Sequence, residues 1–106
     1  MNRGKTASQA GHAFLGAYIQ ALEKTPNIAT EYHADGIGTK VCLSGDLKDI
    51  MRAKHKAEMR GIPCFLVVDS GCPDFFNGQP TVTALGIGPE RREKITPVTG
   101  SFNLTK

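Results

Sequence analysis

The sequence lacks the long apolar segments that membrane insertion and secretion need. No apolar run approaches the roughly 20 residues that cross a bilayer. Met1 to Lys5 leads into a helical pattern without the apolar core of a signal peptide. The 106 residues also contain no internal repeat, no low-complexity tract and no sign of a second domain. These absences predict a single domain, residues 1–106, that works in the cytoplasm.

Cysteine is scarce and shows no metal-binding pattern. The three cysteines are an odd number, and no pair has the close spacing of a zinc or redox motif. Cys42 and Cys64 fall inside apolar runs, where a free cysteine packs as a small hydrophobic side chain. Cys72 lies in an expected loop and is the one thiol placed to react. The pattern fits a reducing compartment.

Positive charge is modest overall but concentrated in one segment. The formal net charge is +3, which alone does not indicate a nucleic-acid-binding protein. Between residues 48 and 60 five basic residues face two acidic ones, so this segment carries five minus two, the whole excess. Four of the basic residues recur at every fourth position and form what we call the basic stripe: Lys48, Arg52, Lys56 and Arg60. Two interpretations stay open: a solvated helix face, or a surface for the phosphates of a nucleic acid.

Apolar periodicity and turn residues predict alternating helices and strands. Pro26 ends the first helix, Asp46 caps the start of the second, and Gly61 ends it. The run 64–68 is continuously apolar, as in a strand covered on both faces. The predicted helices span 5–24, 46–60 and 89–95, and the strands 40–43, 64–68, 81–87 and 101–104. The predicted loops span 27–38, with at most one helical turn, and 69–80. Strands separated by helices indicate a layered α/β fold.

The first helix is predicted to be amphipathic. The face expected to pack on the core holds seven residues at three- and four-residue spacing: Ala7, Ala10, Gly11, Phe14, Leu15, Tyr18 and Leu22. Lys5, Gln9 and His12 lie within about 60° of one another on the opposite face. They are either polar residues on a solvated surface or the polar lining of a site, and His12 has a third interpretation as a packed histidine.

Asp69 ends the apolar strand where the chain leaves the predicted sheet. Ligands gather at the carboxyl ends of strands in open α/β sheets, and a carboxylate there could orient a water molecule or accept a proton. The alternative is structural, because an aspartate at this place can cap the loop by accepting from the amides of Ser70 or Gly71.

Several segments are similar to one known family, in the same order along the chain. The signature Met-x-x-Gly-Lys-x-x-x-Gln-x-x-His-Ala is matched by Met1, Gly4, Lys5, Gln9, His12 and Ala13. Residues 40–43 are similar to the family's second strand, and residues 61–71 to its helix end, buried strand and Asp-x-Gly turn. Residues 81–89 are similar to the family's strand ending in Leu-x-Ile-Gly-Pro, and residues 98–100 to its closing motif. Taken together, the sequence resembles the peptidyl-tRNA hydrolases of the archaeal and eukaryotic type (type 2).

The resemblance implies hydrolysis of the ester that joins a peptide to the 3′ ribose of tRNA, without a metal or a cofactor. It implies a substrate-binding position at Gln9 and catalytic positions at Lys5, His12, Asp69, Thr81 and Thr83. A fixed lysine could stabilise the negative charge that ester attack builds on oxygen. The aspartate could hold the attacking water, while the histidine and the threonines could position substrate. We expect the basic stripe to contact the phosphates of tRNA.

The same resemblance implies a three-layer α/β/α domain around a small mixed four-stranded sheet, and a homodimer. In the family a strand precedes the Met-x-x-Gly-Lys motif. Here Met1 occupies the motif's methionine, so we expect the first strand to be missing, through truncation or a wrongly chosen start.

A second departure from the family pattern favours one of two alternatives that stay open, the non-catalytic one. The family often has Asp-x-Gly-x-Thr after the buried strand, whereas this chain has Pro73 in place of the threonine and so lacks that hydroxyl. One alternative is a non-catalytic relative that binds tRNA or another RNA. The other is a cysteine hydrolase with Cys72 as nucleophile and His12 as base.

Overall fold

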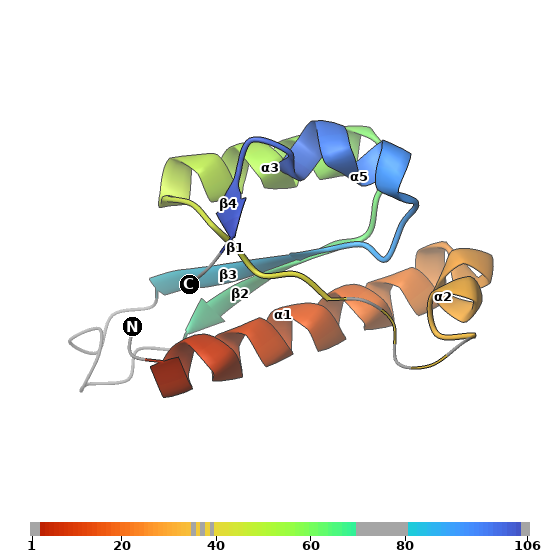
Figure 1. Cartoon of the computed structure of the whole chain (residues 1–106), viewed down its shortest axis with the longest axis horizontal. Coiled ribbons are helices and arrows are strands. Elements are labelled where there is room, and N and C mark those ends of the chain that lie inside the picture. The colour runs from red at the N-terminus through yellow and green to blue at the C-terminus, as the bar shows by residue number, and fades with distance from the viewer. Residues whose placement is uncertain (1–2, 35, 37, 39, 70–80, 105–106) are drawn as a thin grey trace.

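The structure, a computed structural model, describes residues 3–34, 36, 38, 40–69 and 81–104. Its elements in chain order are α1 (Arg3–Lys24), α2 (Pro26–Tyr32), β1 (Leu43–Ser44), α3 (Leu47–Met59), β2 (Cys64–Asp69), β3 (Thr81–Ile87), α5 (Arg92–Thr99) and β4 (Asn103–Leu104). The predicted α/β class is confirmed (Figure 1). Within these described ranges, no helix is long and apolar enough to span a membrane.

Three predictions of local structure were wrong. The strand expected at 40–43 is instead the two-residue β1, Leu43–Ser44. Segment 27–38 was expected to be a loop with at most one helical turn, but Pro26 begins the seven-residue helix α2, because a proline suits the first turn of a helix. The third helix was expected at 89–95, whereas α5 begins at Arg92 and ends at Thr99. The Glu90 side chain accepts from the Arg91 amide at 2.8 Å, and Arg91 is extended, so the helix starts only after it.

The described strands form two antiparallel pairs. β2 pairs with β3, with Cys64 opposite Ile87 and Asp69 opposite Thr81, and β1 pairs with β4. The register of β2 and β3 shifts between Val67 and Val68, which makes Thr83 an extra residue on β3 at a β-bulge. The single mixed four-stranded sheet expected from the sequence is not formed by the described residues.

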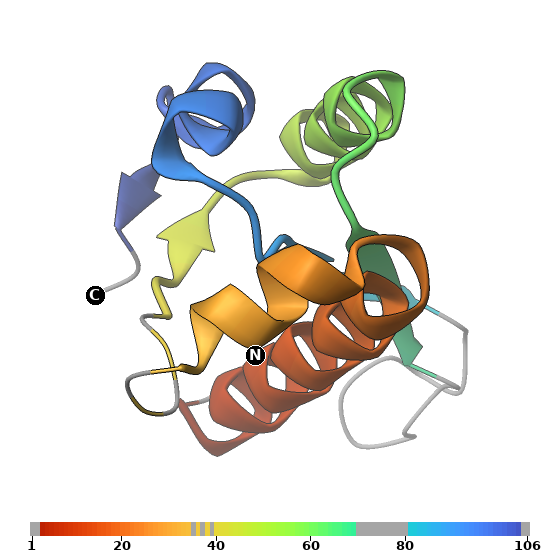
Figure 2. The same cartoon turned by 90° about the vertical axis from the view of Figure 1, so that its right-hand side faces the viewer.

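Helices lie on both sides of the β2–β3 pair, α1 and α2 on one side and α3 and α5 on the other (Figure 1, Figure 2). The buried residues of α1 recur at every fourth position: Gln9, Ala13, Ala17 and Ala21. Gly86 of β3 lies against this line, so that a methyl group at Gly86 would overlap the carbonyl oxygen of Ala13. Small residues on both elements therefore let the helix approach the strand closely.

The predicted inward face of α1 was wrong. Phe14 and two others of the seven expected residues are half-buried, and the remaining four are exposed: Ala7, Gly11, Leu15 and Leu22. The prediction followed the bulkiest apolar side chains, whereas the close approach at Gly86 leaves room only for small ones. Consequently Gln9, which was expected on the opposite, solvated face, is buried against the strands.

On the other side of the strands, α3 packs through an apolar cluster. Four residues form its buried centre: Ala53, Ala57, Ile62 and Val98. Half-buried side chains from β2, β3 and the segment after α5 pack against it: Cys64, Leu85, Ile87 and Phe102. The cluster ties α3 to α5 and to the strands.

Both predicted ends of α3 are confirmed. Asp46 and Asp49 form a capping box, in which each side chain accepts from the other residue's amide, at 2.8 and 3.3 Å. Gly61 has φ +68°, and its amide and that of Ile62 donate to carbonyls of the last turn at 3.1 and 2.9 Å. This is the glycine-based helix end that satisfies terminal carbonyls.

Candidate active site

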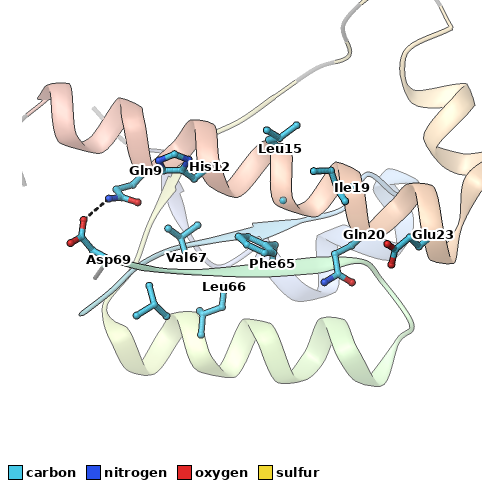
Figure 3. Close-up of a pocket in the computed structure, with 12 residues that line it drawn as sticks. Gln9, His12, Leu15, Ile19, Gln20, Glu23, Phe65, Leu66, Val67 and Asp69 are labelled. Atoms are coloured by element: carbon cyan, nitrogen blue, oxygen red, sulfur yellow. Dashed lines mark hydrogen bonds between the residues drawn. The ribbon is translucent and has the colours of Figure 1, made fainter. Parts of the chain in front are cut away.

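The carboxylate of Asp69 receives two donors from α1. The Lys5 ammonium lies 2.6 Å from its Oδ2 atom, and Gln9 Nε2 donates to the same oxygen at 2.9 Å (Figure 3). The exposed fraction of the side chain is 8% for Asp69 and 18% for Lys5, and Gln9 is 4% exposed. We call these three residues the Asp69 cluster. Of the residues predicted for a site, the structure brings these three together.

The periods of the two elements explain how the cluster forms. Lys5 and Gln9 are one turn apart at the start of the sheet-facing line of α1. On β2, Phe65 and Val67 point toward α1, and the two-residue period of a strand sends Asp69 the same way. Because the N-terminal end of α1 lies beside the end of β2 (Figure 1), the last residue of this set meets the first turns of the helix.

Gln9 leaves one buried polar atom unused. Its Oε1 atom has no hydrogen-bond partner among the described residues. An unsatisfied buried acceptor costs about 1–3 kcal/mol, and a buried ion pair adds little net stability because its charges lose their hydration. The Asp69 cluster has both features, so it adds little to the stability of the fold. A water molecule or a hydroxyl group would satisfy Gln9 Oε1.

The two predicted threonines lie at the start of β3 but differ in their surroundings. Thr81 is opposite Asp69 in the β2–β3 register, which places both side chains on the same face of the pair. The Thr83 hydroxyl donates to the Val67 carbonyl at 3.4 Å, next to the β-bulge. Thr81 therefore borders the Asp69 cluster, whereas the hydroxyl of Thr83 is engaged by the backbone.

An open groove of about 750 Å³ begins at the Asp69 cluster and runs between α1 and β2 (Figure 3). His12 lines this groove together with Gln9 and Asp69. It is exposed, and the hydrogen bonds and ion pairs of the described residues include none between His12 and Asp69. His12 thus borders the cluster without joining it.

The basic stripe lies elsewhere. All four of its residues are exposed, three on α3 and Arg60 at its C-cap, on the opposite side of the β2–β3 pair from α1 (Figure 1, Figure 2). Arg52 and Lys56 line a shallow pocket of about 50 Å³ together with Ser101 and Phe102. The structure does not bring the stripe together with the Asp69 cluster.

The cysteines give a mixed outcome. Cys42 was expected to pack as an apolar side chain but is exposed, because the chain there precedes the short strand β1 rather than forming it. Cys64 is half-buried, and burial, followed by the nearby Glu58 carboxylate, raises the pKa of its thiol. Cys72 and Pro73 lie outside the described residues, as do Ser70 and Gly71. Across the described ranges, no three His, Cys, Asp or Glu side chains gather as a metal site would require.

Two features of the site were not predicted from the sequence: the groove, and the burial of Gln9. The available signal was the four-residue spacing that continues from Lys5 and Gln9 into Ala13 and Ala17. A line of small residues indicates the face of a helix that approaches its neighbour closely. If small residues are taken to mark the packed face, the spacing predicts that Lys5 and Gln9 face the sheet.

The chain is similar to a set of proteins that share one name. The family described as "Peptidyl-tRNA hydrolase PTH2" matches residues 1–105. The "Peptidyl-tRNA hydrolase" of Methanopyrus kandleri is 40% identical over 106 residues, which is 100% of this chain and 89% of that protein. The protein of the same name from Methanocaldococcus jannaschii is 35% identical over 104 residues, covering 98% and 89% of the two chains. The one from Thermoplasma acidophilum is 32% identical, with coverage of 98% and 87%.

Proposed function

Because this chain belongs to the peptidyl-tRNA hydrolase PTH2 family, we infer that it hydrolyses the ester bond between the peptide and the tRNA of peptidyl-tRNA. The reaction recycles tRNA from stalled translation. The whole-chain match carries this conclusion, and the Asp69 cluster supplies a place for the chemistry, with a carboxylate, an ammonium and an amide held together and largely buried.

Ester hydrolysis needs a positioned water molecule and compensation for the negative charge that builds on the carbonyl oxygen. We assign the first role to Asp69, whose carboxylate can hold water within hydrogen-bond reach of the ester, and the second to the Lys5 ammonium beside it. The water oxygen bonds to the carbonyl carbon, the bond to the ribose 3′ oxygen breaks, and the water's proton ends on that leaving oxygen. Gln9 binds substrate, with its buried Oε1 accepting from the water or from a ribose hydroxyl.

Three further residues complete the proposed site. The register of the strands supports a substrate-positioning role for Thr81 beside Asp69. His12 borders the groove at the same end, where an imidazole could donate to a substrate oxygen. Thr83 holds the Val67 carbonyl at the bulge, and we propose that it fixes the end of β2 that carries Asp69.

The basic stripe is proposed to bind tRNA. Its four side chains are exposed on α3 and its C-cap residue, and the ion pairs found among the described residues include none of the four. Such cations suit phosphates, which set the position of a nucleic acid without reading its sequence. The stripe and the Asp69 cluster would then contact separate parts of a large substrate.

Four features of the whole protein are proposed from the same resemblance: its domain organisation, its sheet, its oligomeric state and its location. The chain forms a single domain, and its two strand pairs belong to one mixed four-stranded sheet within three layers. The position of helices on both sides of the β2–β3 pair supports this arrangement. We also propose a homodimer and a cytoplasmic location, where translation supplies the substrate.

The test is cleavage of N-acetyl-aminoacyl-tRNA in the presence of EDTA. The wild-type protein should cleave it, and Asp69→Asn should lower kcat by about 10²-fold because the carboxylate no longer holds the water. Glu31→Gln is the matched control, since the Glu31 carboxylate also pairs with a cation, Arg91 at 2.9 Å, but on the exposed surface. Glu31→Gln should leave kcat unchanged.

Other outcomes separate the alternatives. Normal tRNA binding without ester cleavage by the wild-type protein would favour the non-catalytic relative. Cys72→Ser should keep nearly full activity, whereas a cysteine nucleophile would lose almost all of it. Activity that EDTA removes and a divalent cation restores would show that the metal-independent mechanism is wrong.

A further inference from the structure

The groove that begins at the Asp69 cluster continues well beyond it. Its lining extends from Gln9 and Asp69 at one end to Gln20 and Glu23 at the other (Figure 3). The proposed chemistry uses only the first end. A substrate with its ester beside Asp69 would have the remaining length of the groove available for one of its two parts, the peptide or the tRNA.

The middle of the groove is apolar and open. Leu15 and Ile19 from α1 and Phe65 from β2 line it, and all three are exposed large hydrophobic residues. Exposed apolar patches of this kind indicate interaction sites. The whole lining contains two acidic residues, Glu23 and Asp69, and neither lysine nor arginine, whereas nucleic-acid backbones bind where cations neutralise phosphates. The groove therefore suits a peptide and not an RNA strand.

The groove also follows an edge of β2. Among the described residues β2 pairs with β3 alone. The Val67 carbonyl accepts from Thr83 and so faces β3, which turns the backbone amides and carbonyls of Leu66 and Val68 to the other edge. An edge of this kind presents a row of donors and acceptors to another chain, and an extended peptide can add to it as a further strand.

We propose that the groove binds the peptide moiety of the substrate as an extended strand alongside β2, a proposal that rests on the function inferred above. The ester must lie at the Asp69 cluster, so the C-terminal residue of the peptide lies beside Asp69 and its chain extends toward Cys64, parallel to β2. Main-chain pairing does not read side chains, which suits substrates that carry peptides of many sequences. β2 has six residues, and both chains rise about 3.3 Å per residue, so the strand accommodates about six peptide residues.

The first experiment measures how the rate depends on peptide length. The substrates are N-acetylated peptidyl-tRNAs with one tRNA, one esterified residue and peptides of one, three, six or nine residues. kcat/KM should rise about tenfold or more from one to six residues, as apolar side chains enter the groove, and then level off. N-methylation of alternate peptide amides in the six-residue substrate should remove much of the gain, because it removes main-chain donors.

Two aspartate substitutions on α1 form a matched pair. Ile19 is 49% exposed and lines the groove, while Leu22 is 47% exposed on the same helix and does not line it. Ile19→Asp should lower kcat/KM about tenfold for the six-residue substrate and leave that for N-acetyl-aminoacyl-tRNA unchanged. Leu22→Asp should change neither value.

The outcomes separate this proposal from the function on which it rests. Equal kcat/KM at all peptide lengths, or equal effects of the two aspartate variants, would overturn the peptide groove while leaving hydrolysis of the one-residue substrate intact. Failure of the wild-type protein to cleave any substrate would overturn the hydrolase function itself. If Ile19→Asp converts a dimer to monomers in sedimentation and slows all lengths equally, a second copy of the chain occupies the groove and the proposal is wrong.

Discussion

The two sides of the β2–β3 pair bury different kinds of residue. On the side of α1, the line of buried positions includes the polar Gln9, which together with Lys5 meets Asp69. On the side of α3, the buried centre is wholly apolar and the helix is capped at both ends. Apolar burial and caps stabilise a fold, whereas a buried ion pair and an unsatisfied amide do not. We therefore propose that the α3 side provides stability and that the α1 side holds the chemistry.

The largest expected effect tests whether the Asp69 cluster contributes to catalysis and adds little to the stability of the fold. Lys5→Met and Asp69→Asn should each lower kcat by about 10²-fold, and the double variant should be about as inactive as either, because the groups act as a unit. Lys5→Met removes the cation beside the Asp69 carboxylate, which should cost roughly 1–3 kcal/mol of unfolding free energy at this partly exposed site. The double variant removes both charges and should regain part of that loss. Single-turnover kinetics and urea unfolding measure the two quantities.

Lys54→Met is the control for Lys5→Met. Lys54 pairs with Glu58 at 3.1 Å on the exposed surface of α3, where such pairs contribute about 0–1 kcal/mol. Its loss should leave kcat unchanged. If the double variant lowers kcat by the product of the two single losses, the Lys5 and Asp69 side chains act independently. The Asp69 cluster would then not be one functional unit.

The next effect concerns the close approach of α1 to β3. Gly86→Ala should lower stability by about 1–3 kcal/mol, because the added methyl group forces the helix away from the strand. It should also lower kcat, because α1 carries Lys5 and Gln9. Gly11→Ala is the control: Gly11 is exposed on the same helix with no atom within 4 Å of an added methyl. It should raise stability by about 0.5–1 kcal/mol. Thermal unfolding that ranks the two variants equally would contradict the close packing.

A smaller effect is expected from the basic stripe. Replacing Arg52 and Lys56 together by glutamine should weaken tRNA binding about fivefold to tenfold, and the log–log slope of affinity against salt should fall by somewhat under about one per lost phosphate contact. Lys54→Gln, on the same helix but off the stripe, should leave the slope unchanged. Cleavage of bound substrate in single-turnover reactions should keep its rate. An unchanged slope in the double variant would make the stripe an ordinary solvated face.

The smallest effect tests whether the α3 side is purely structural. Asp46→Ala removes the side chain that caps α3 and should cost about 1 kcal/mol of unfolding free energy. Asp46→Asn keeps an acceptor at the same place and should cost less. Neither variant should alter kcat at temperatures where both are folded. A lower kcat for Asp46→Ala would show that the two sides are coupled.

Local signals in the sequence predicted local structure well. Asp46 and Gly61 mark the two ends of α3, because a capping side chain and a left-handed glycine act within one turn of a helix. The existence of β2 was equally readable, because the run from Cys64 is short and continuously apolar. The expected cover on both faces was wrong, since Phe65 and Val68 are exposed. The proposal that Lys5, Gln9 and Asp69 are site residues came from the resemblance, and the structure shows that their side chains meet.

Contacts between distant segments were harder to predict. The sequence places Leu15 and Leu22 on the inner face of α1 by their hydrophobicity, but the face that packs inward is set by Gly86, 64 positions after Leu22. The engagement of Thr83 depends on a β-bulge that arises from pairing with Val67. Gly86 leaves no trace in the apolar periodicity of α1, and the bulge leaves none in that of β3.

The contact between Ala13 and Gly86 also restricts which substitutions the chain can accept over evolutionary time. A larger residue at position 86 is tolerated only if α1 moves outward, and that movement would carry Lys5 and Gln9 away from Asp69. Ala17, which also lies against Gly86, falls under the same restriction. Substitutions at these three positions should therefore be interdependent, and a library randomised at all three should yield active sequences in which small residues occur in combination rather than singly.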